Sequence, residues 1–417
     1  MIDNTHRRRL VALLTEAAEL EHALMCQYLY AALSMKRRIE EGVSWQQLEL
    51  MRRWEASIML ICRQEMEHLG LVCNLLTAIG EAPWLTRPNL PLAPRHYDLE
   101  VESKLERLTE ETLVRFALFE IPDAEIEQPD RELLAQALGQ EIDPQRYQTI
   151  GRLYDEIAQL FEQLGESLFI GPPGAELATT DVIPVPLRGI SLPNTARIYD
   201  VELVPVTGLA SALAVVEQIV AEGEGAPGSS GESHFKRVLA ILREFRDERE
   251  RDPAFDPARP VTAHPDPHAI SDRRTRRVSQ LFDDAYATLL LLLMRFFAHS
   301  DERTAELTGL QRAAFFPMMT TVIRPLAEVL TLLPTGDGAS TAGPAFRFTR
   351  NITLIPHREA AWQVIQDELD ALTATAEDLS GDSGYPLQVR DRLRLMHENL
   401  ARIGLDFGLA MGTAVAP

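Results

Sequence analysis

Glu65 and His68 have the residue types and the spacing of metal ligands within one long helical pattern. A Glu and a His three positions apart lie one turn apart on an α-helix, so that a carboxylate oxygen and an imidazole nitrogen can reach the same ion. Apolar residues recur around them at alternating steps of four and three, which places both side chains on the core-facing side of the helix. This seam consists of Trp54, Ile58, Ile61, Glu65, His68, Val72, Leu75 and Ile79. Glu67 lies about 200° around the helix from Glu65, and we expect it to face outward.

A second seam upstream carries another carboxylate, Glu21, where an aliphatic residue would be expected. The seam consists of Leu10, Leu14, Ala17, Glu21, Leu24, Tyr28, Ala31 and Met35. Unpaired carboxylates are costly to bury, so two of them beside a histidine are explained most simply by a bound cation. A Glu on one helix and a Glu-x-x-His on the next form half of a carboxylate-bridged site for two metal ions. The alternative is a hydrogen-bonded Glu–His pair without metal. Oxygen-rich ligands favour iron or manganese over structural zinc.

The length and composition of the chain exclude several classes of function. The chain has 417 residues, of which 46% are apolar, and a net charge of -21. This length predicts two or more domains, and this charge argues against a partner that is nucleic acid or an anionic membrane. Three cysteines without a Cys-x-x-Cys indicate a reducing compartment. We read no signal peptide, and the longest apolar run, 285–294, is too short to cross a bilayer. We therefore expect a cytoplasmic protein.

Helical periodicity dominates the chain and predicts an all-α protein. In the first part, helices are expected over 5–40, 44–80, 106–121, 146–169 and 208–222, and a further one begins near Glu232. The short connection between the first two predicts antiparallel packing. Residues 251–271 contain five prolines and two histidines and are interpreted as a linker.

The region after this linker predicts a second helical bundle. Its helices are expected over 272–299, 302–333 with interruptions at Pro317 and Pro325, 355–380 and 385–410. The predicted organisation is therefore a bundle domain over 1–250, the linker 251–271 and a second helical domain over 272–417.

A site for two metals needs further acids and a second histidine. Glu120 shares a predicted helix face with Leu113 and Phe116. Glu217 and His234 follow later in the chain, in the order that such a bundle requires. Each residue alone could instead be a surface or capping residue. Glu156, in the predicted helix 146–169, is an acid that competes with Glu120 for its position.

Several segments together resemble one family. They are Glu21-His-Ala-Leu-Met-Cys-Gln-Tyr28, Glu65-Met-Glu-His-Leu69, Phe116-Ala-Leu-Phe-Glu-Ile-Pro122, Ile150-Gly-Arg-Leu-Tyr154, Glu222-Gly-Glu-Gly225 and Ser233-His-Phe235. The chain resembles the ferritin-like domain family of the iminophenyl-pyruvate dimer synthases, which is similar to the oxidative-coupling enzymes of violacein, rebeccamycin and staurosporine biosynthesis. The resemblance covers roughly residues 5–240 and implies a ferritin-like four-helix bundle. It also implies the metal-site positions Glu21, Glu65, His68, Glu120, Glu217 and His234.

The function that these observations favour is a non-haem di-iron oxidoreductase acting on a small, amino-acid-derived imine or a related natural-product intermediate. The expected cofactor is two iron ions, with manganese as the alternative, and Glu65 is expected to bridge them. Some relatives are associated with haem, but the sequence contains no Cys-x-x-Cys-His. Tyr28 lies two turns from Glu21 on the same seam and either packs in the core or takes part in the chemistry.

Two other classes of function remain open. One is a ferritin-like protein that oxidises or handles iron without an organic substrate, and the other is a scaffold with a vestigial site. The expected partner is a small-molecule substrate, and the expected assembly is a monomer or a small homo-oligomer.

Overall fold

The computed structural model of the protein describes residues 4–94, 96–97, 101–123, 125–141, 150–171, 203–225, 233–298, 302, 304–349 and 352–412. Within these ranges the regular structure is helical, and β pairing is limited to isolated bridges. The expectation of an all-α fold is confirmed.

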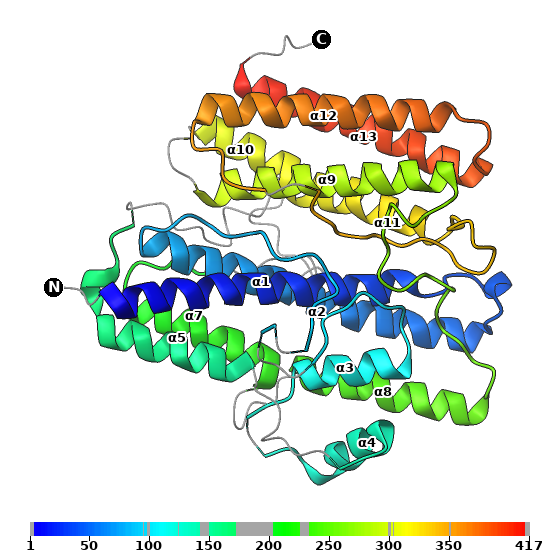
Figure 1. Ribbon diagram of the computed structural model, residues 1–417, viewed down its shortest axis with the longest axis horizontal. Coiled ribbons are helices and arrows are strands. Elements are labelled where there is room, and N and C mark those ends of the chain that lie inside the picture. The colour runs from blue at the N-terminus through cyan, green and yellow to red at the C-terminus, as the bar shows by residue number, and fades with distance from the viewer. Residues whose placement is uncertain are drawn as a thin grey trace, which may run out of the picture.

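Two long antiparallel helices, α1 (Asn4–Ser34) and α2 (Trp45–Ala78), form the centre of the molecule (Figure 1). The start of α2 is defined by a capping box. The Ser44 hydroxyl accepts from the Gln47 backbone N–H at 3.2 Å, and the Gln47 side chain accepts from the Ser44 N–H at 2.8 Å. The first helix ends six residues earlier than the predicted residue 40. It ends there because the chain leaves the helix to pair with another segment, with the Lys36 N–H donating to the Pro257 carbonyl at 2.8 Å.

The third and fourth positions of the bundle are each filled by two shorter helices. The third position holds α3 (Glu110–Phe119) and α5 (Ile150–Leu164), and the fourth holds α7 (Leu209–Val220) and α8 (His234–Arg251). α5 and α7 pack together on one half of the α1–α2 pair, while α3 and α8 pack together along the other half (Figure 1). Both breaks in helical structure therefore fall near the middle of α1 and α2.

An additional helix, α4 (Gln128–Leu138), was not expected from the sequence. It packs against α3 and α8. Its Asp130 carboxylate pairs with Lys236 at 2.7 Å and with Arg243 at 3.1 Å on α8. These ion pairs fasten α4 to the outside of the bundle.

The C-terminal helices form a further layer. They are α9 (Arg273–Ala298), α10 (Thr304–Ala313), a π-helical stretch (Ala314–Ile323), α11 (Arg324–Leu330), α12 (Arg358–Gly381) and α13 (Leu387–Met411). α12 and α13 pack side by side on the outside, while α9 contacts both α12 and α2. The interruptions expected at Pro317 and Pro325 are present, since Pro317 lies in the π-helical stretch and Pro325 is the second residue of α11. The predicted domain boundaries remain a prediction.

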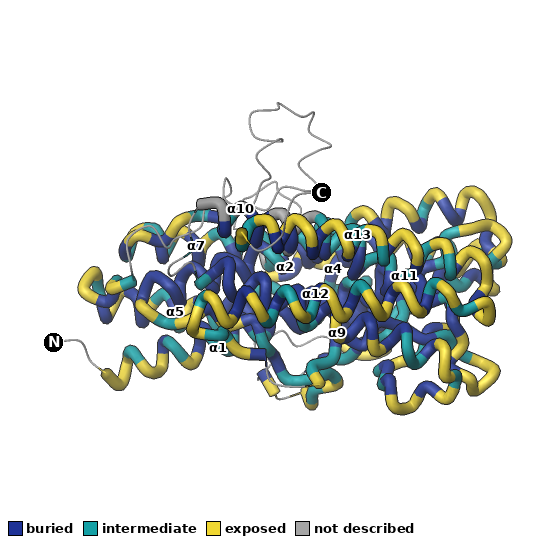
Figure 2. The backbone as a smooth tube through the Cα atoms, turned by 90° about the horizontal axis from the view of Figure 1, so that it is seen from above, coloured by how far each residue is buried: buried dark blue, intermediate teal, exposed yellow. Residues whose placement is uncertain are grey.

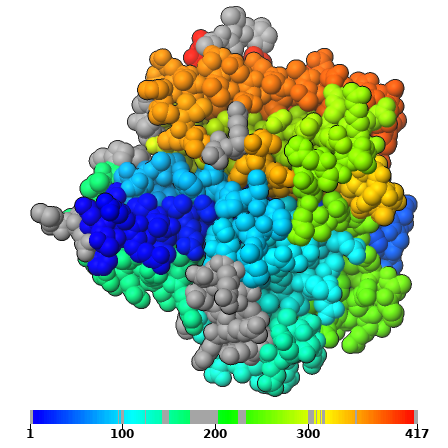
Figure 3. All heavy atoms as spheres, in the orientation of Figure 1, coloured from blue at the N-terminus to red at the C-terminus, as the bar shows by residue number. Residues whose placement is uncertain are grey.

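The layers enclose the middle of α1 on all sides. The space-filling view shows the C-terminal helices resting directly on the N-terminal ones (Figure 3), and in the view from above many of the exposed positions lie along the outer sides of the helices (Figure 2). Every residue from Leu20 to Tyr28 is buried, which is the pattern of a helix surrounded by protein. Within the described residues, no helix is both long and apolar enough to cross a membrane.

Candidate metal centre

Five metal-ligating side chains converge in the buried middle of the bundle. Glu21, Glu65 and His68 form one group of three, and Glu65, Glu120 and His234 form a second. In each group the potential ligand atoms lie within 4.8 Å of one another, and all five side chains are buried. Glu65 belongs to both groups.

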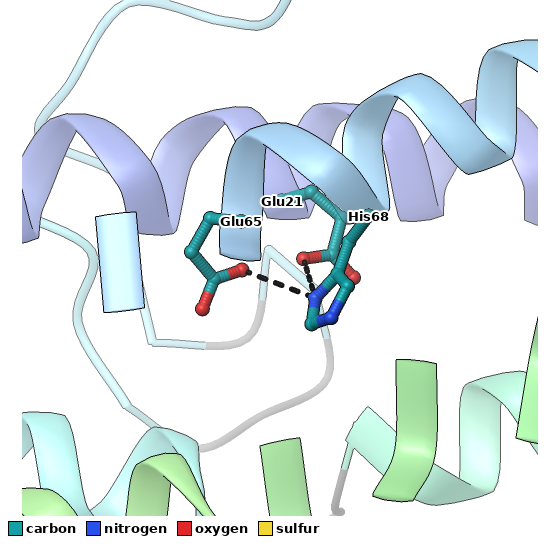
Figure 4. A group of neighbouring side chains, drawn as sticks. All are labelled: Glu21, Glu65 and His68. Atoms are coloured by element: carbon teal, nitrogen blue, oxygen red, sulfur yellow. Dashed lines mark ion pairs between the residues drawn. The ribbon is translucent and has the colours of Figure 1, made fainter. Parts of the chain in front are cut away.

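The two carboxylate oxygens of Glu65 face different histidines. Its Oε1 lies 3.1 Å from Nδ1 of His234, and its Oε2 lies 3.7 Å from Nδ1 of His68. On the outer sides, Glu21 Oε2 lies 3.4 Å from His68 Nδ1 (Figure 4), and Glu120 Oε2 lies 3.5 Å from His234 Nδ1. A carboxylate between two Glu–His pairs has the placement of a bridging ligand.

The interrupted helices supply the second group. Glu120 is the residue directly after α3, and His234 is the first residue of α8. The start of α8 is set by Ser233, whose hydroxyl accepts from the Lys236 backbone N–H at 3.4 Å. Because both breaks lie beside the middle of α2, these residues reach Glu65. The structure thus brings together five of the six metal positions that the resemblance implied.

Glu217 is not part of this cluster. It is exposed on α7, because the buried face of this helix consists of Ala212, Val215, Val216 and Ile219. Glu222 approaches the cluster instead, with its Oε2 3.2 Å from Nε2 of His68. Glu222 lies just after α7, in the π-helical turn Ala221–Gly225.

Two other acids are placed differently from the sequence-based expectations. Glu156, the competing acid, lies on α5 outside the cluster, where it is half-exposed and pairs with Arg9 at 2.8 Å. Glu67 lies outside the cluster as expected, but it does not face solvent. It is buried, and its carboxylate pairs with Arg63 at 2.8 Å.

A tyrosine hydroxyl donates to each outer carboxylate of the cluster. Tyr154 of α5 donates to Glu21 Oε1 at 2.5 Å, and Tyr28 of α1 donates to Glu120 Oε1. Each carboxylate therefore has one oxygen held by a tyrosine and the other beside a histidine. Tyr28 packs edge-on against Phe116, with ring centroids 4.4 Å apart, so it combines packing with a hydrogen bond to the cluster. In the sequence, Tyr154 belongs to a segment that resembles the family but is not among the implied metal-site positions.

Burial and crowding shift the pKa values of these groups. Burial, followed by the negative charge of Glu65, raises the pKa of Glu21 to about 7. Burial lowers the pKa of His234, but Glu120 and Glu65 outweigh it, so that its pKa rises to about 9. His68 behaves in the same way beside Glu21 and Glu222, and its pKa lies well above the ordinary value. Without metal, protons on these groups offset the carboxylate charges.

The donor set fits a metal pair. Nδ1 of His234 faces Glu65 and Glu120, whereas its Nε2 is buried and makes no hydrogen bond within the described part of the chain, which is costly unless another partner is bound. In His68, Nε2 faces Glu222, which leaves Nδ1 for the side of Glu21 and Glu65. Metal-ligating histidines commonly donate the second ring N–H to a carboxylate in this way. Carboxylate oxygens with two imidazoles suit iron or manganese.

The chain belongs to the ferritin-like family, whose model, described as Ferritin-like, matches residues 14–243. It is 28% identical over 400 residues to the dichlorochromopyrrolate synthase of Lentzea aerocolonigenes, covering 86% of this chain and 38% of the synthase. It is 30% identical over 365 residues to the 2-imino-3-(indol-3-yl)propanoate dimerase of Chromobacterium violaceum, covering 81% of this chain and 34% of the dimerase. These relatives confirm the resemblance found in the sequence, although the chain spans less than two fifths of their length.

A solved structure of a ferritin-like protein from Caulobacter vibrioides aligns with 74% of this chain and 95% of its own. The sequence identity is 20% and the TM-score is 0.43.

Proposed function

We propose that the protein is a non-haem di-metal oxidoreductase, with iron as the metal and manganese as the alternative. Its substrate would be a small, amino-acid-derived imine or a related intermediate. The observation that carries the proposal is the position of Glu65, one oxygen of which faces each of two buried Glu–His pairs. The substrate class rests on the relatives, one of which is named for the dimerisation of an imino acid.

The residues divide into two ligand groups around Glu65. Glu21 and His68 would hold one ion, Glu120 and His234 would hold the other, and Glu65 would bridge them. When bound, the metal pair supplies redox chemistry with O2 or peroxide. Glu21, Glu65, Glu120 and Glu222 place four carboxylates at the site, which would balance the charge of two divalent cations.

The surrounding residues orient the ligands. Tyr28 and Tyr154 each hold one oxygen of an outer carboxylate, so that the other oxygen remains directed toward the ions. Glu222 accepts the Nε2 proton of His68 and so selects the tautomer with a free Nδ1 lone pair. Burial of all five ligands excludes bulk water, which strengthens each electrostatic interaction in the site.

The test is reconstitution with Fe(II) without oxygen, followed by elemental analysis and O2 consumption. Indole-3-pyruvate imine, generated in place from L-tryptophan by an amino-acid oxidase, is the organic probe, and coupled products are followed by mass spectrometry. We expect two ions per chain and products that depend on bound metal. Metal content well below one ion per chain would refute the proposal. O2 consumption with Fe(II) alone, by a large particle that mineralises iron, would instead support an iron-handling protein.

A further inference from the structure

A separate cavity of about 220 Å³ lies at the opposite end of the α1–α2 hairpin from the start of α1. It is lined by residues that follow α1, by Arg259 before α9, by Glu328 of α11 and by Arg392 of α13. Glu21 precedes the last residue of α1, Ser34, by 13 positions. At the rise of an α-helix, this places the cavity roughly 20 Å from the metal ligands. It is therefore distinct from the candidate metal centre.

The charge of the cavity wall is opposite in sign to that of the chain. The protein has a net charge of -21, yet four arginines and three glutamates line this cavity. Two of these glutamates are already engaged by arginines at short distances. Glu41 pairs with Arg259 at 2.6 Å, and Glu328 pairs with Arg37 at 3.3 Å and with Arg324 at 3.2 Å.

Two guanidinium groups of the wall remain weakly engaged. The Arg38 side chain forms no hydrogen bond or ion pair with any described residue, although it lines the cavity. Arg392 approaches only the already shared Glu328, at 3.8 Å. In addition, Nε of Arg37 is buried without a hydrogen-bond acceptor among the described residues. The wall therefore has more donors than acceptors.

We propose that this cavity binds a small oxyanion, the phosphate or carboxylate group of a small molecule, between Arg38 and Arg392. The planar fork of N–H donors in arginine matches the oxygens of both groups and binds them through paired, charge-assisted hydrogen bonds. The volume accommodates inorganic phosphate or a short dicarboxylate. Chloride offers no comparable array of acceptor oxygens.

The position of the cavity gives the bound anion a structural effect. Its wall combines residues after α1, a residue of the 251–271 segment and residues of α11 and α13. A ligand that binds only when these parts are assembled stabilises the folded state by mass action. The anion would therefore raise the unfolding temperature as well as bind.

The experiment titrates the full, metal-loaded chain calorimetrically with inorganic phosphate and, separately, with succinate. Both titrations are made at constant ionic strength, with chloride as the reference anion. The test variant is the double substitution R38Q/R392Q. The matched control is R394Q, which removes an arginine from the same helix α13 whose partner is Asp391 at 2.6 Å. The single variant R38Q is included in case the double variant does not fold. Arg38 is exposed, so its substitution should not affect folding.

We expect saturable binding of at least one of the two anions, with one site per chain. Binding should weaken about tenfold or more in R38Q/R392Q, because charge-assisted hydrogen bonds are lost, and should weaken in the same direction in R38Q. R394Q should bind like the parent protein, and metal content should be equal in all variants. Phosphate binding alone assigns a phosphoryl ligand, and succinate binding alone assigns a carboxylate ligand. Absence of saturable binding, equal binding by all variants, or an equal rise in unfolding temperature with chloride would overturn the proposal.

Discussion

At the scale of single residues, the proposed centre depends most on Glu65. Removing this side chain takes one ligand from each ion, whereas removing an outer carboxylate affects one ion only. Glu67 offers a matched comparison on the same helix, because it is also buried but pairs with Arg63 outside the cluster.

We expect Glu65→Gln to lose most of the bound metal and Glu67→Gln to retain it. The amide introduced by Glu65→Gln has no negative charge and only one oxygen, so it cannot bridge two cations as a carboxylate does. Iron per folded chain, measured by elemental analysis after gel filtration, compares the two variants. Equal losses would show that the two-ion arrangement around Glu65 is wrong.

Metal uptake should also depend on pH, because ligation displaces protons. At pH 6 the metal-free site retains protons on Glu21, with a pKa of about 7, and on His234, with a pKa of about 9. A cation must displace these protons, so its apparent affinity should rise as the pH increases from 6 toward 8. Titration with Mn(II) in buffers of different ionisation enthalpy measures both the affinity and the protons released. An affinity that is independent of pH, without proton release, would contradict these protonation states.

The sequence indicates for a physical reason that the acidic and histidine side chains of α1 and α2 lie in the core. Glu21, Glu65 and His68 interrupt long apolar seams, in which a polar residue is conspicuous and the helical phase is defined over many turns. Glu222 does not interrupt a long apolar seam of this kind. Its role depends on the end of a short helix and on a contact with His68, which is distant in sequence.

At the scale of elements, the breaks in the third and fourth helices position half of the centre. The sequence indicated the shorter helices but not that their ends would meet at Glu65. The sequence pattern places Glu217 on a stripe between Leu213 and Val220, but the face of α7 that is buried consists of Ala212, Val215, Val216 and Ile219. The chain then enters a π-helical turn, Ala221–Gly225, which changes the angular position of the residues that follow. These two features explain why the sequence pattern favours Glu217, whereas the structure brings Glu222 to the cluster.

The variants Glu222→Gln and Glu217→Gln test whether the π-helical turn places Glu222, and not Glu217, at the metal site. Glu222→Gln should weaken metal binding by about 10–100-fold, as expected when a carboxylate partner of a ligating histidine is lost. Glu217→Gln should have no measurable effect, because Glu217 is exposed on α7. Competition with a chelator of known affinity measures both changes. The reverse ranking would favour the sequence-based choice of Glu217.

At the scale of the whole molecule, the C-terminal layer completes the burial of α1. His22 donates from Nδ1 to the Leu85 carbonyl at 2.8 Å, and its Nε2 accepts from the hydroxyl of Tyr286 on α9. Arg87, in the segment between α2 and α3, donates to the Phe346 carbonyl at 2.8 Å. Three regions that are distant in sequence thus share one polar and aromatic interface beside the ligand-bearing helix. These pairings link distant segments, so helical periodicity alone could not predict them.

A buried acid in this interface makes the packing of the layers dependent on pH. Asp283 of α9 is buried, and among the described residues its carboxylate accepts one long hydrogen bond, from the Arg347 backbone N–H at 3.3 Å. Burial raises its pKa to about 8, although the nearby Arg347 and Arg87 favour the charged form. Because the folded protein binds this proton more tightly than the unfolded chain, the free energy of unfolding should fall as the pH rises from about 4 toward 8.

Asp283→Asn removes this titration while it retains a side chain of similar size. We expect the variant to be close to the parent protein in stability at pH 5 and more stable at pH 8, by on the order of a few kcal/mol. Denaturant unfolding of both proteins across this range measures the difference, and subtraction isolates Asp283 because all other titrating groups are common to the two chains. Asp284→Asn is the matched control, since Asp284 is the exposed neighbour of Asp283 on α9. Parallel profiles for the parent protein and Asp283→Asn would show that Asp283 is ionised in the folded protein. In that case, the interface between α1 and the C-terminal layer would contain a stabilised negative charge instead of a neutral carboxyl group.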